Sequence, residues 1–94
     1  MPPLSEKDIS TRLSSLPAWQ IERGELVRRF QFADFRAAMA FVNQVADAAE
    51  SAQHHPDIDI RYNKVRLALV THDAGGLTAS DFDLAAAADQ ITAA

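Results

Sequence analysis

The sequence contains no cysteine. Neither a disulfide framework nor a cysteine metal site is therefore available, and the composition is compatible with a reducing compartment. No stretch approaches the roughly 18 apolar residues that a membrane span needs, and the start, MPPLSEKDIS, lacks a basic segment followed by an apolar run. We therefore expect a soluble, cytoplasmic protein that is not bound to a membrane.

The chain also lacks an excess of basic residues. Its net charge of −4 argues against a general nucleic-acid binder, because binding to phosphates depends on Lys and Arg. Six of the nine cations nevertheless fall between positions 28 and 66: Arg28, Arg29, Arg36, Arg61, Lys64 and Arg66. Solvated faces of strands and a helix are the simpler interpretation, and a small anion site is the alternative.

Length and composition indicate one folded unit. A chain of 94 residues has room for one core, and a hydrophobic share of 48% with 23% charged residues is typical of a compact domain. No repeat or low-complexity linker divides it. We expect a single domain over residues 1–94.

Apolar residues recur at helical spacing in three stretches, at about residues 5–15, at 34–53 and from Thr78 onward. Each stretch begins at a residue type that caps helices: Ser5, Asp34 and Thr78. Pro56 prevents the middle helix from continuing and favours an extended backbone at His55. The sequence therefore predicts three helices, the longest of which ends near the histidines.

Two hairpins are predicted between these helices. AWQIE and ELVRRFQF meet at Arg23 and Gly24, and DIDIRY and KVRLALVTH meet at Asn63 and Lys64. The order α-β-β-α-β-β-α predicts an α+β fold, a four-stranded antiparallel sheet with three helices packed on one face. Because so small a sheet leaves one face and two edges open, we expect a homo-oligomer.

The chain has three histidines, and each is expected at the end of an element. His54 and His55 close the long helix, and His72 ends the last strand before a glycine-rich turn. Glu50 lies four residues before His54, where a helical carboxylate can orient an imidazole. Three imidazoles in one cleft would supply both an acid and a base near neutral pH.

Other interpretations of these side chains stay open. A histidine at a helix end is often only a solvated cap, and three neutral imidazoles can bind zinc. Against zinc, adjacent histidines rarely point at one ion, and no HxH or HxxxH pair is present. For Trp19 and Phe30 we expect core or interface packing before stacking on a ligand.

At this point the spacing of the polar residues resembles a known signature. Glu50, three residues, HHP, then Tyr62, His72 and Asp81 resemble the pattern of the pterin-4a-carbinolamine dehydratases, the family that includes the dimerization cofactor of a liver transcription factor. The similarity extends to LPAW, RRFQFADFRAAMAFVNQVADAAE and THDAGGLTASDFDLA, so it covers nearly the whole chain without a departure at the matched positions.

The resemblance implies an enzyme that removes water from 4a-hydroxytetrahydropterin to give quinonoid dihydropterin, without metal or organic cofactor. It implies histidine acid and base catalysis by His54, His55 and His72. Glu50 would orient His54, and Asp81 would orient a group or cap a helix. The substrate contacts that it implies are Glu50, His54, His55, Pro56, Thr71, His72, Asp73 and Ala74.

The resemblance also implies partners. Family members form homodimers or homotetramers, and the reaction serves tetrahydrobiopterin recycling, in functional coupling to an aromatic amino acid hydroxylase. Some members act as partner proteins. The alternative function is therefore a non-catalytic pterin-binding or oligomerisation module that regulates another protein.

Overall fold

The computed structural model describes residues 2–93. Its helices are α1 (Glu6–Leu13), α2 (Phe35–Ala52) and α3 (Ala79–Ala93), with one short 3-10 turn, η1 (His72–Ala74). Its strands are β1 (Gln20–Glu22), β2 (Glu25–Gln31), β3 (Asp57–Arg61) and β4 (Lys64–Leu69). The predicted α+β order of helices and hairpins is confirmed. No helix over residues 2–93 has the length and apolar character needed to cross a membrane.

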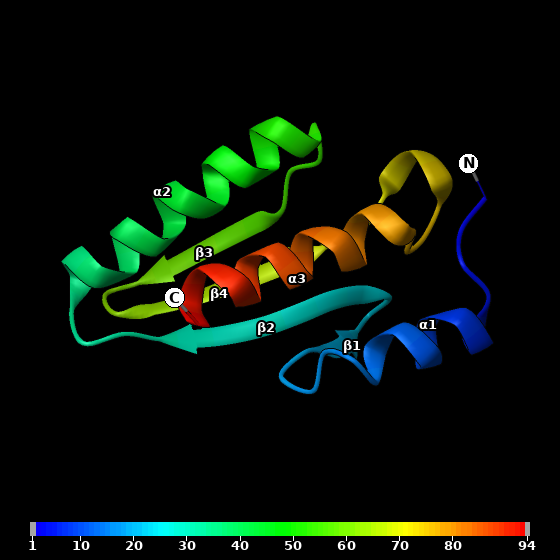
Figure 1. The fold of residues 1–94 in the computed structure, drawn as a ribbon, viewed down its shortest axis with the longest axis horizontal. Coiled ribbons are helices and arrows are strands. Elements are labelled where there is room, and N and C mark those ends of the chain that lie inside the picture. Colours follow the sequence, from blue (N-terminus) through cyan, green and yellow to red (C-terminus); the bar gives the residue numbers. More distant parts are fainter. Residues whose placement is uncertain (1, 94) are drawn as a thin grey trace.

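The strands form one antiparallel sheet in the order β1-β2-β4-β3. The two hairpins are joined through their second strands, so β2 and β4 are central and β1 and β3 are the edges. Figure 1 shows α2 and α3 running across the same face of the sheet, with α1 beside β1. On the other face, which we call the outer face, no helix formed by residues 2–93 is packed (Figure 1).

Successive side chains of a strand point to opposite faces of the sheet, so every second residue of β2 and β4 faces the helices. Val65, Leu67 and Leu69 of β4 are buried, as the sequence predicts, and they pack with the apolar stripe of α2. Trp19 packs edge to face on Phe30, with ring centroids 6.1 Å apart, so both are core aromatics as expected.

The predicted helix starts are confirmed. The hydroxyl of Ser5 accepts the backbone N–H of Asp8 at 3.1 Å, and the carboxylate of Asp34 accepts that of Ala37 at 2.9 Å. Each side chain satisfies one of the N–H groups that a helix leaves without a partner in its first turn.

The end of α2 lies at Gln53, as the sequence predicts. Gln53 adopts a left-handed conformation (φ 51°, ψ 41°), and its N–H donates to Glu50 O while the N–H of His54 donates to Ala49 O. This pair of bonds is a Schellman cap, which stops the helix three residues before Pro56. His54 therefore follows the cap and lies just outside the helix that we expected it to close.

The end of β4 also differs. The strand ends at Leu69, and Thr71 forms an isolated bridge with Gly76, which closes the loop that contains η1. His72 therefore begins a 3-10 turn and does not end a strand. The Thr71 N–H bond to Gly76 O, at 3.2 Å, holds the start of this loop beside the start of α3.

Candidate active site

His54 and Asp81 come together at the end of the sheet where β3 begins and β4 ends. His54 Nε2 lies 2.5 Å from Asp81 Oδ1, although 27 positions separate the two residues. The imidazole is 14% exposed and the carboxylate is fully buried. A buried carboxylate needs hydrogen-bond donors to compensate for its lost hydration, and His54 provides one of them.

Asp81 receives two further bonds from the turn that starts α3. Its Oδ2 accepts the backbone N–H of Thr78 at 2.9 Å and the hydroxyl of Thr71 at 2.8 Å. The predicted capping role of Asp81 is thus confirmed, because the Thr78 bond is half of a capping box. The same carboxylate also binds His54, so one residue both starts α3 and orients an imidazole.

The direction of each bond follows from the chemistry of a carboxylate. An ionised carboxylate only accepts hydrogen bonds, so Thr71 gives its single hydroxyl proton to Asp81. Thr71 Oγ1 also lies 2.8 Å from Thr78 Oγ1, and with its own proton committed it must accept the proton of Thr78. The buried hydroxyl of Thr78 therefore supports Thr71, which supports Asp81.

This network fixes the tautomer of His54. Because Asp81 accepts, Nε2 of His54 carries a proton in the neutral imidazole, and Nδ1 holds the lone pair. Nδ1 is then the nitrogen that can take a proton from a substrate, or give one up when the ring is charged.

Glu50 holds His55 and not His54, so the predicted pairing is wrong. Glu50 Oε2 lies 2.5 Å from His55 Nε2, and both side chains are exposed, at 76% and 62%. The reason is the Schellman cap at Gln53, which takes His54 out of the helical register that an i, i+4 pair requires. Each of the adjacent imidazoles thus has its own carboxylate, one buried and one solvated.

The other predicted site residues lie near this corner without contacting it through hydrogen bonds. His72 and Asp73 are exposed in η1, directly after Thr71, and Ala74 and Pro56 are half-buried. Within residues 2–93 the side chain of His72 makes no hydrogen bond, so the structure does not join it to His54 or His55 as it joins each of these to a carboxylate. Two hollows over the described residues, one on the sheet and one at the start of α2, are lined by other side chains.

The side chains at the corner are not arranged as a metal centre. Across residues 2–93 no group of three or more His, Asp or Glu converges on a position that could hold an ion. Nε2 of His54 and Nε2 of His55 each already face a carboxylate. The arrangement suits proton transfer, because two histidines adjacent in the chain each keep one ring nitrogen that no carboxylate holds.

Sequence reasoning did not identify the hydroxyl of Thr78 as part of the site, and it assigned Thr71 to the substrate. The pattern T-x-x-D at Thr78 and Asp81 is typical of a helix start. It could also have indicated the hydrogen-bond network, because the carboxylate that caps α3 is the one that binds His54. The hydroxyl of Thr71 is committed to Asp81, and its backbone is bonded within the loop, where its N–H donates to Gly76 O and its carbonyl oxygen accepts the N–H of Ala74.

Comparisons with known proteins agree with this fold. The family model described as pterin 4 alpha carbinolamine dehydratase matches residues 2–91. A protein of Acidobacterium capsulatum, provisionally named a pterin-4-alpha-carbinolamine dehydratase, is 65% identical over 97% of this chain and 99% of its own length. One of Nostoc sp. with the same provisional name is 52% identical over 94% of this chain and 95% of its own length.

Solved structures share the architecture. The crystal structure of a transcriptional coactivator/pterin dehydratase from Brucella melitensis superposes with a TM-score of 0.91 at 34% identity, covering 95% of this chain and 97% of the other. A pterin dehydratase-like protein described as a RuBisCO assembly factor in the alpha-carboxysome has the same fold, with a TM-score of 0.64 at 24% identity over 78% of this chain and 84% of its own. The chain belongs to the pterin 4 alpha carbinolamine dehydratase family, whose named activity is that of a hydro-lyase.

Proposed function

We propose that the protein eliminates water from a 4a-hydroxytetrahydropterin to give the quinonoid dihydropterin, with proton transfer by His54 and His55. The observation that carries this proposal is the pair of adjacent imidazoles, each held at Nε2 by its own carboxylate. Family membership supports a dehydratase in general terms, and the geometry supplies the groups that such a reaction needs.

The reaction needs one acid and one base. The bond between C4a and the hydroxyl oxygen breaks with its electron pair on oxygen, and an acid protonates that oxygen so that it leaves as water. The ring then carries a positive charge, which it loses when a base removes the proton on its neighbouring nitrogen. The two transfers balance, because the proton given by the acid is replaced by the one that the base collects.

Their environments suggest how the two histidines divide this work. His54 is largely buried beside the ionised Asp81, which stabilises the imidazolium that forms when Nδ1 accepts a proton. His55 is solvent-exposed beside Glu50 and exchanges protons with water readily. We assign His54 as the base and His55 as the acid that protonates the leaving hydroxyl.

The remaining predicted contacts complete the proposed site. His72 would be the third imidazole, and Asp73 and Ala74 would present the backbone of η1 to the pterin, with Pro56 on the opposite side. Glu50 and Thr71 would act through His55 and Asp81, since their polar atoms are already engaged there. We propose no metal and no organic cofactor for the reaction.

An assay of the dehydration itself tests this proposal. The 4a-hydroxytetrahydropterin is generated in situ, and its loss is followed by ultraviolet absorbance with and without purified protein, after subtraction of the spontaneous reaction. We expect micromolar protein to accelerate the reaction, and EDTA to leave the acceleration unchanged. No acceleration would refute the catalytic proposal, and a stoichiometric ion lost together with activity would point to a metal site instead.

A non-catalytic role is the second candidate, because one structural neighbour is described as a RuBisCO assembly factor and another as a transcriptional coactivator. This chain would then bind pterin or another protein without turnover. A stable complex with a partner, combined with pterin binding and no acceleration in the assay, would favour this role.

We also propose a single domain that assembles as a cytoplasmic homodimer or homotetramer and supports tetrahydrobiopterin recycling beside an aromatic amino acid hydroxylase. The family model covers residues 2–91, which supports one domain. The edge strand β3 is exposed and includes Ile58, a large apolar residue that is 37% accessible. Sedimentation equilibrium would distinguish a monomer from either assembly.

A further inference from the structure

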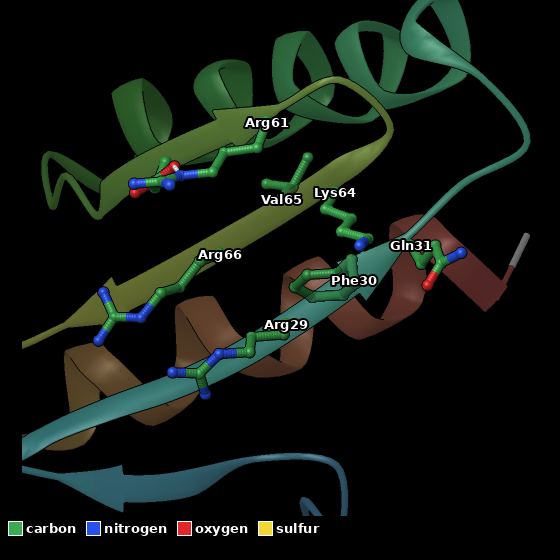
Figure 2. Close-up of a pocket in the computed structure, with 8 residues that line it drawn as sticks. Arg29, Phe30, Gln31, Arg61, Lys64, Val65 and Arg66 are labelled. Carbon is green, nitrogen blue, oxygen red and sulfur yellow. Dashed lines mark hydrogen bonds and ion pairs between the residues drawn. The ribbon is translucent and has the colours of Figure 1, made fainter.

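A hollow of about 490 Å³ lies on the outer face of the sheet (Figure 2). It spans the central strands β2 and β4 and the edge strand β3. Two of its lining residues, Phe30 and Val65, have side chains that belong to the core. The side chains of the polar lining residues therefore form the rim of the hollow. The polar lining consists of Arg29, Gln31, Asp59, Arg61, Lys64 and Arg66. We call this site the cationic hollow.

The register of the sheet places like charges directly opposite each other in this hollow. Arg29 faces Arg66 across β2 and β4, and Arg61 faces Lys64 across β3 and β4. Like charges at such positions destabilise a sheet. Cations often protect sheet edges from pairing, but β2 and β4 are central strands, so this explanation does not apply to Arg29, Lys64 or Arg66.

The acids nearby engage only part of these cations. Glu22 binds Arg29 through two bonds, at 2.6 and 3.0 Å, and reaches Arg66 at 3.7 Å. Asp59 accepts from Nε of Arg61 at 3.2 Å. Over residues 2–93 the side chain of Lys64 makes no hydrogen bond or ion pair, and that of Arg66 makes only the long ion pair with Glu22, so both retain donors for a ligand.

The charge at this site is opposite to that of the whole chain. Four cations line the hollow with Asp59, and Glu22 reaches in from β1, which leaves an excess of two positive charges in a protein of net charge −4. Hydrogen bonding from Arg29 lowers the pKa of Glu22, so this carboxylate is ionised at neutral pH. Its negative charge is included in the excess of two positive charges. An anion is the ligand that such a field attracts.

We propose that the cationic hollow binds a phosphate group, with Arg66 and Lys64 as its direct ligands and Arg61 as a third donor. A guanidinium presents paired N–H groups that match two phosphate oxygens, and an ammonium adds a point charge. The volume exceeds what one phosphate fills and falls in the range of small-molecule sites, which favours an organic phosphate over inorganic phosphate as the ligand. This site is new relative to the proposed dehydration and does not depend on it.

The hollow is separate from the histidine corner. Lys64, Val65 and Arg66 are the residues of β4 that line the hollow, and Arg66 lies three residue steps, about 10 Å, before Leu69. The histidine corner lies beyond Leu69, and neither His54, His55 nor Asp81 lines the hollow. A ligand in the hollow therefore does not occupy the proposed pterin site.

Nuclear magnetic resonance of the full chain tests the proposal. Inorganic phosphate and adenosine 5′-monophosphate are titrated separately into the 15N-labelled protein, with sodium chloride of equal ionic strength as the reference, because salt alone screens surface charges. We expect saturable shifts of the backbone amides of 29–31 and 64–66 with both probes. Tighter binding of the nucleotide identifies an organic phosphate, and equal binding shows that inorganic phosphate suffices. Adenosine is the control without phosphate and should give no saturable shift at these amides.

Three variants sharpen the test. Lys64→Gln/Arg66→Gln should weaken phosphate binding at least about fivefold, because it removes both direct ligands. Lys7→Gln/Arg12→Gln removes the same two charges from exposed positions of α1 and should leave binding unchanged. Glu22→Gln should strengthen binding, because it removes the competing carboxylate and releases Arg29.

Several results would overturn the proposal. These are the absence of saturable shifts, equal weakening in the α1 control, or adenosine binding as well as its monophosphate. A short DNA duplex that binds far more tightly than either probe would show that the face recognises a polyanion instead. A change in sedimentation mass in Lys64→Gln/Arg66→Gln would show that a second copy of the chain covers it.

Discussion

His54 Nε2 and Asp81 Oδ1 lie 2.5 Å apart, and this contact joins the segment after α2 to the first turn of α3. The carboxylate is buried and accepts three donors, so it is a rigid support for the imidazole. In an imidazole held in this way, one ring nitrogen is bound to the carboxylate and the other is available for proton transfer in a fixed direction. The fold thereby supplies the preorganisation that proton transfer to a bound substrate requires.

Asp81→Asn should slow dehydration by about 10- to 100-fold, because an amide cannot accept from all three donors and no longer fixes the tautomer of His54. The 15N shifts of the imidazole provide a readout that a purely structural role would not move. We expect the Nε2–H tautomer in the wild-type protein and a mixture in the variant. An unchanged rate with an unchanged tautomer would contradict the role assigned to Asp81.

Glu50→Ala should lower the rate by about two- to fivefold, a modest effect because the ion pair with His55 is exposed. In double-mutant cycles the loss should be non-additive with His55→Ala and additive with His54→Ala. Asp47→Ala removes a neighbouring exposed carboxylate of α2 and serves as the control. Coupling to His54→Ala instead would show that the pairing seen here does not operate during turnover.

Thr71→Val should destabilise the fold by ~1–3 kcal/mol, since it removes a donor from the buried Asp81. Thr78→Val should cost about 1 kcal/mol, because only the bond to Thr71 is lost and the backbone cap stays. Urea unfolding measures both. Thr11→Val, at an exposed position of α1, should stay within about 0.5 kcal/mol of the wild-type value. Equal stability of all three variants would exclude the network as a source of stability.

Glu22 should make stability depend on pH in the acid range. Hydrogen bonding and charge from Arg29 lower its pKa below the usual 4.5, so its stabilising contribution is present above about that pH and is lost as the pH falls through the lowered pKa. Glu22→Gln should therefore be less stable than the wild type at pH 7, and the two should converge at strongly acidic pH. Glu25→Gln, which removes the acid directly opposite, is the control. Parallel urea stabilities of wild type and Glu22→Gln at all pH values would contradict this linkage.

The fold was predictable from sequence because its signals are local. Alternation in KVRLALV placed Val65, Leu67 and Leu69 on the core face, and Ser5 and Asp34 marked helix starts that the structure confirms. These patterns depend on near neighbours in the chain, which a single sequence displays.

The pairing of the site residues was not predictable in the same way. The i, i+4 rule paired Glu50 with His54, but the left-handed conformation of Gln53 ends the helix before His54. Such a cap is usually a glycine, and the sequence has none at this position, so the cap was not predictable. The contact between His54 and Asp81 depends on how α3 packs beside the end of α2. It is a tertiary relationship, because the sequence pattern marked Asp81 only as a helix cap and the resemblance to a family was needed to single it out as a site residue.

Each histidine variant should be informative by itself. His54→Ala and His55→Ala should each reduce the dehydration rate at least about tenfold, because a general acid or base usually contributes more than that. His72→Ala tests the proposed third imidazole and should mainly weaken pterin binding, since its ring has no partner that positions it over residues 2–93. Circular dichroism spectra that match the wild type would exclude misfolding as the cause.

The most direct test of the central claim is the rate of 4a-hydroxytetrahydropterin dehydration with the wild-type protein and with His54→Ala/His55→Ala, measured side by side against the spontaneous reaction. We predict a clear acceleration by the wild type and a rate close to the spontaneous one with the double variant. Wild-type acceleration by a correctly folded double variant would contradict the assignment of these two imidazoles as the acid and the base.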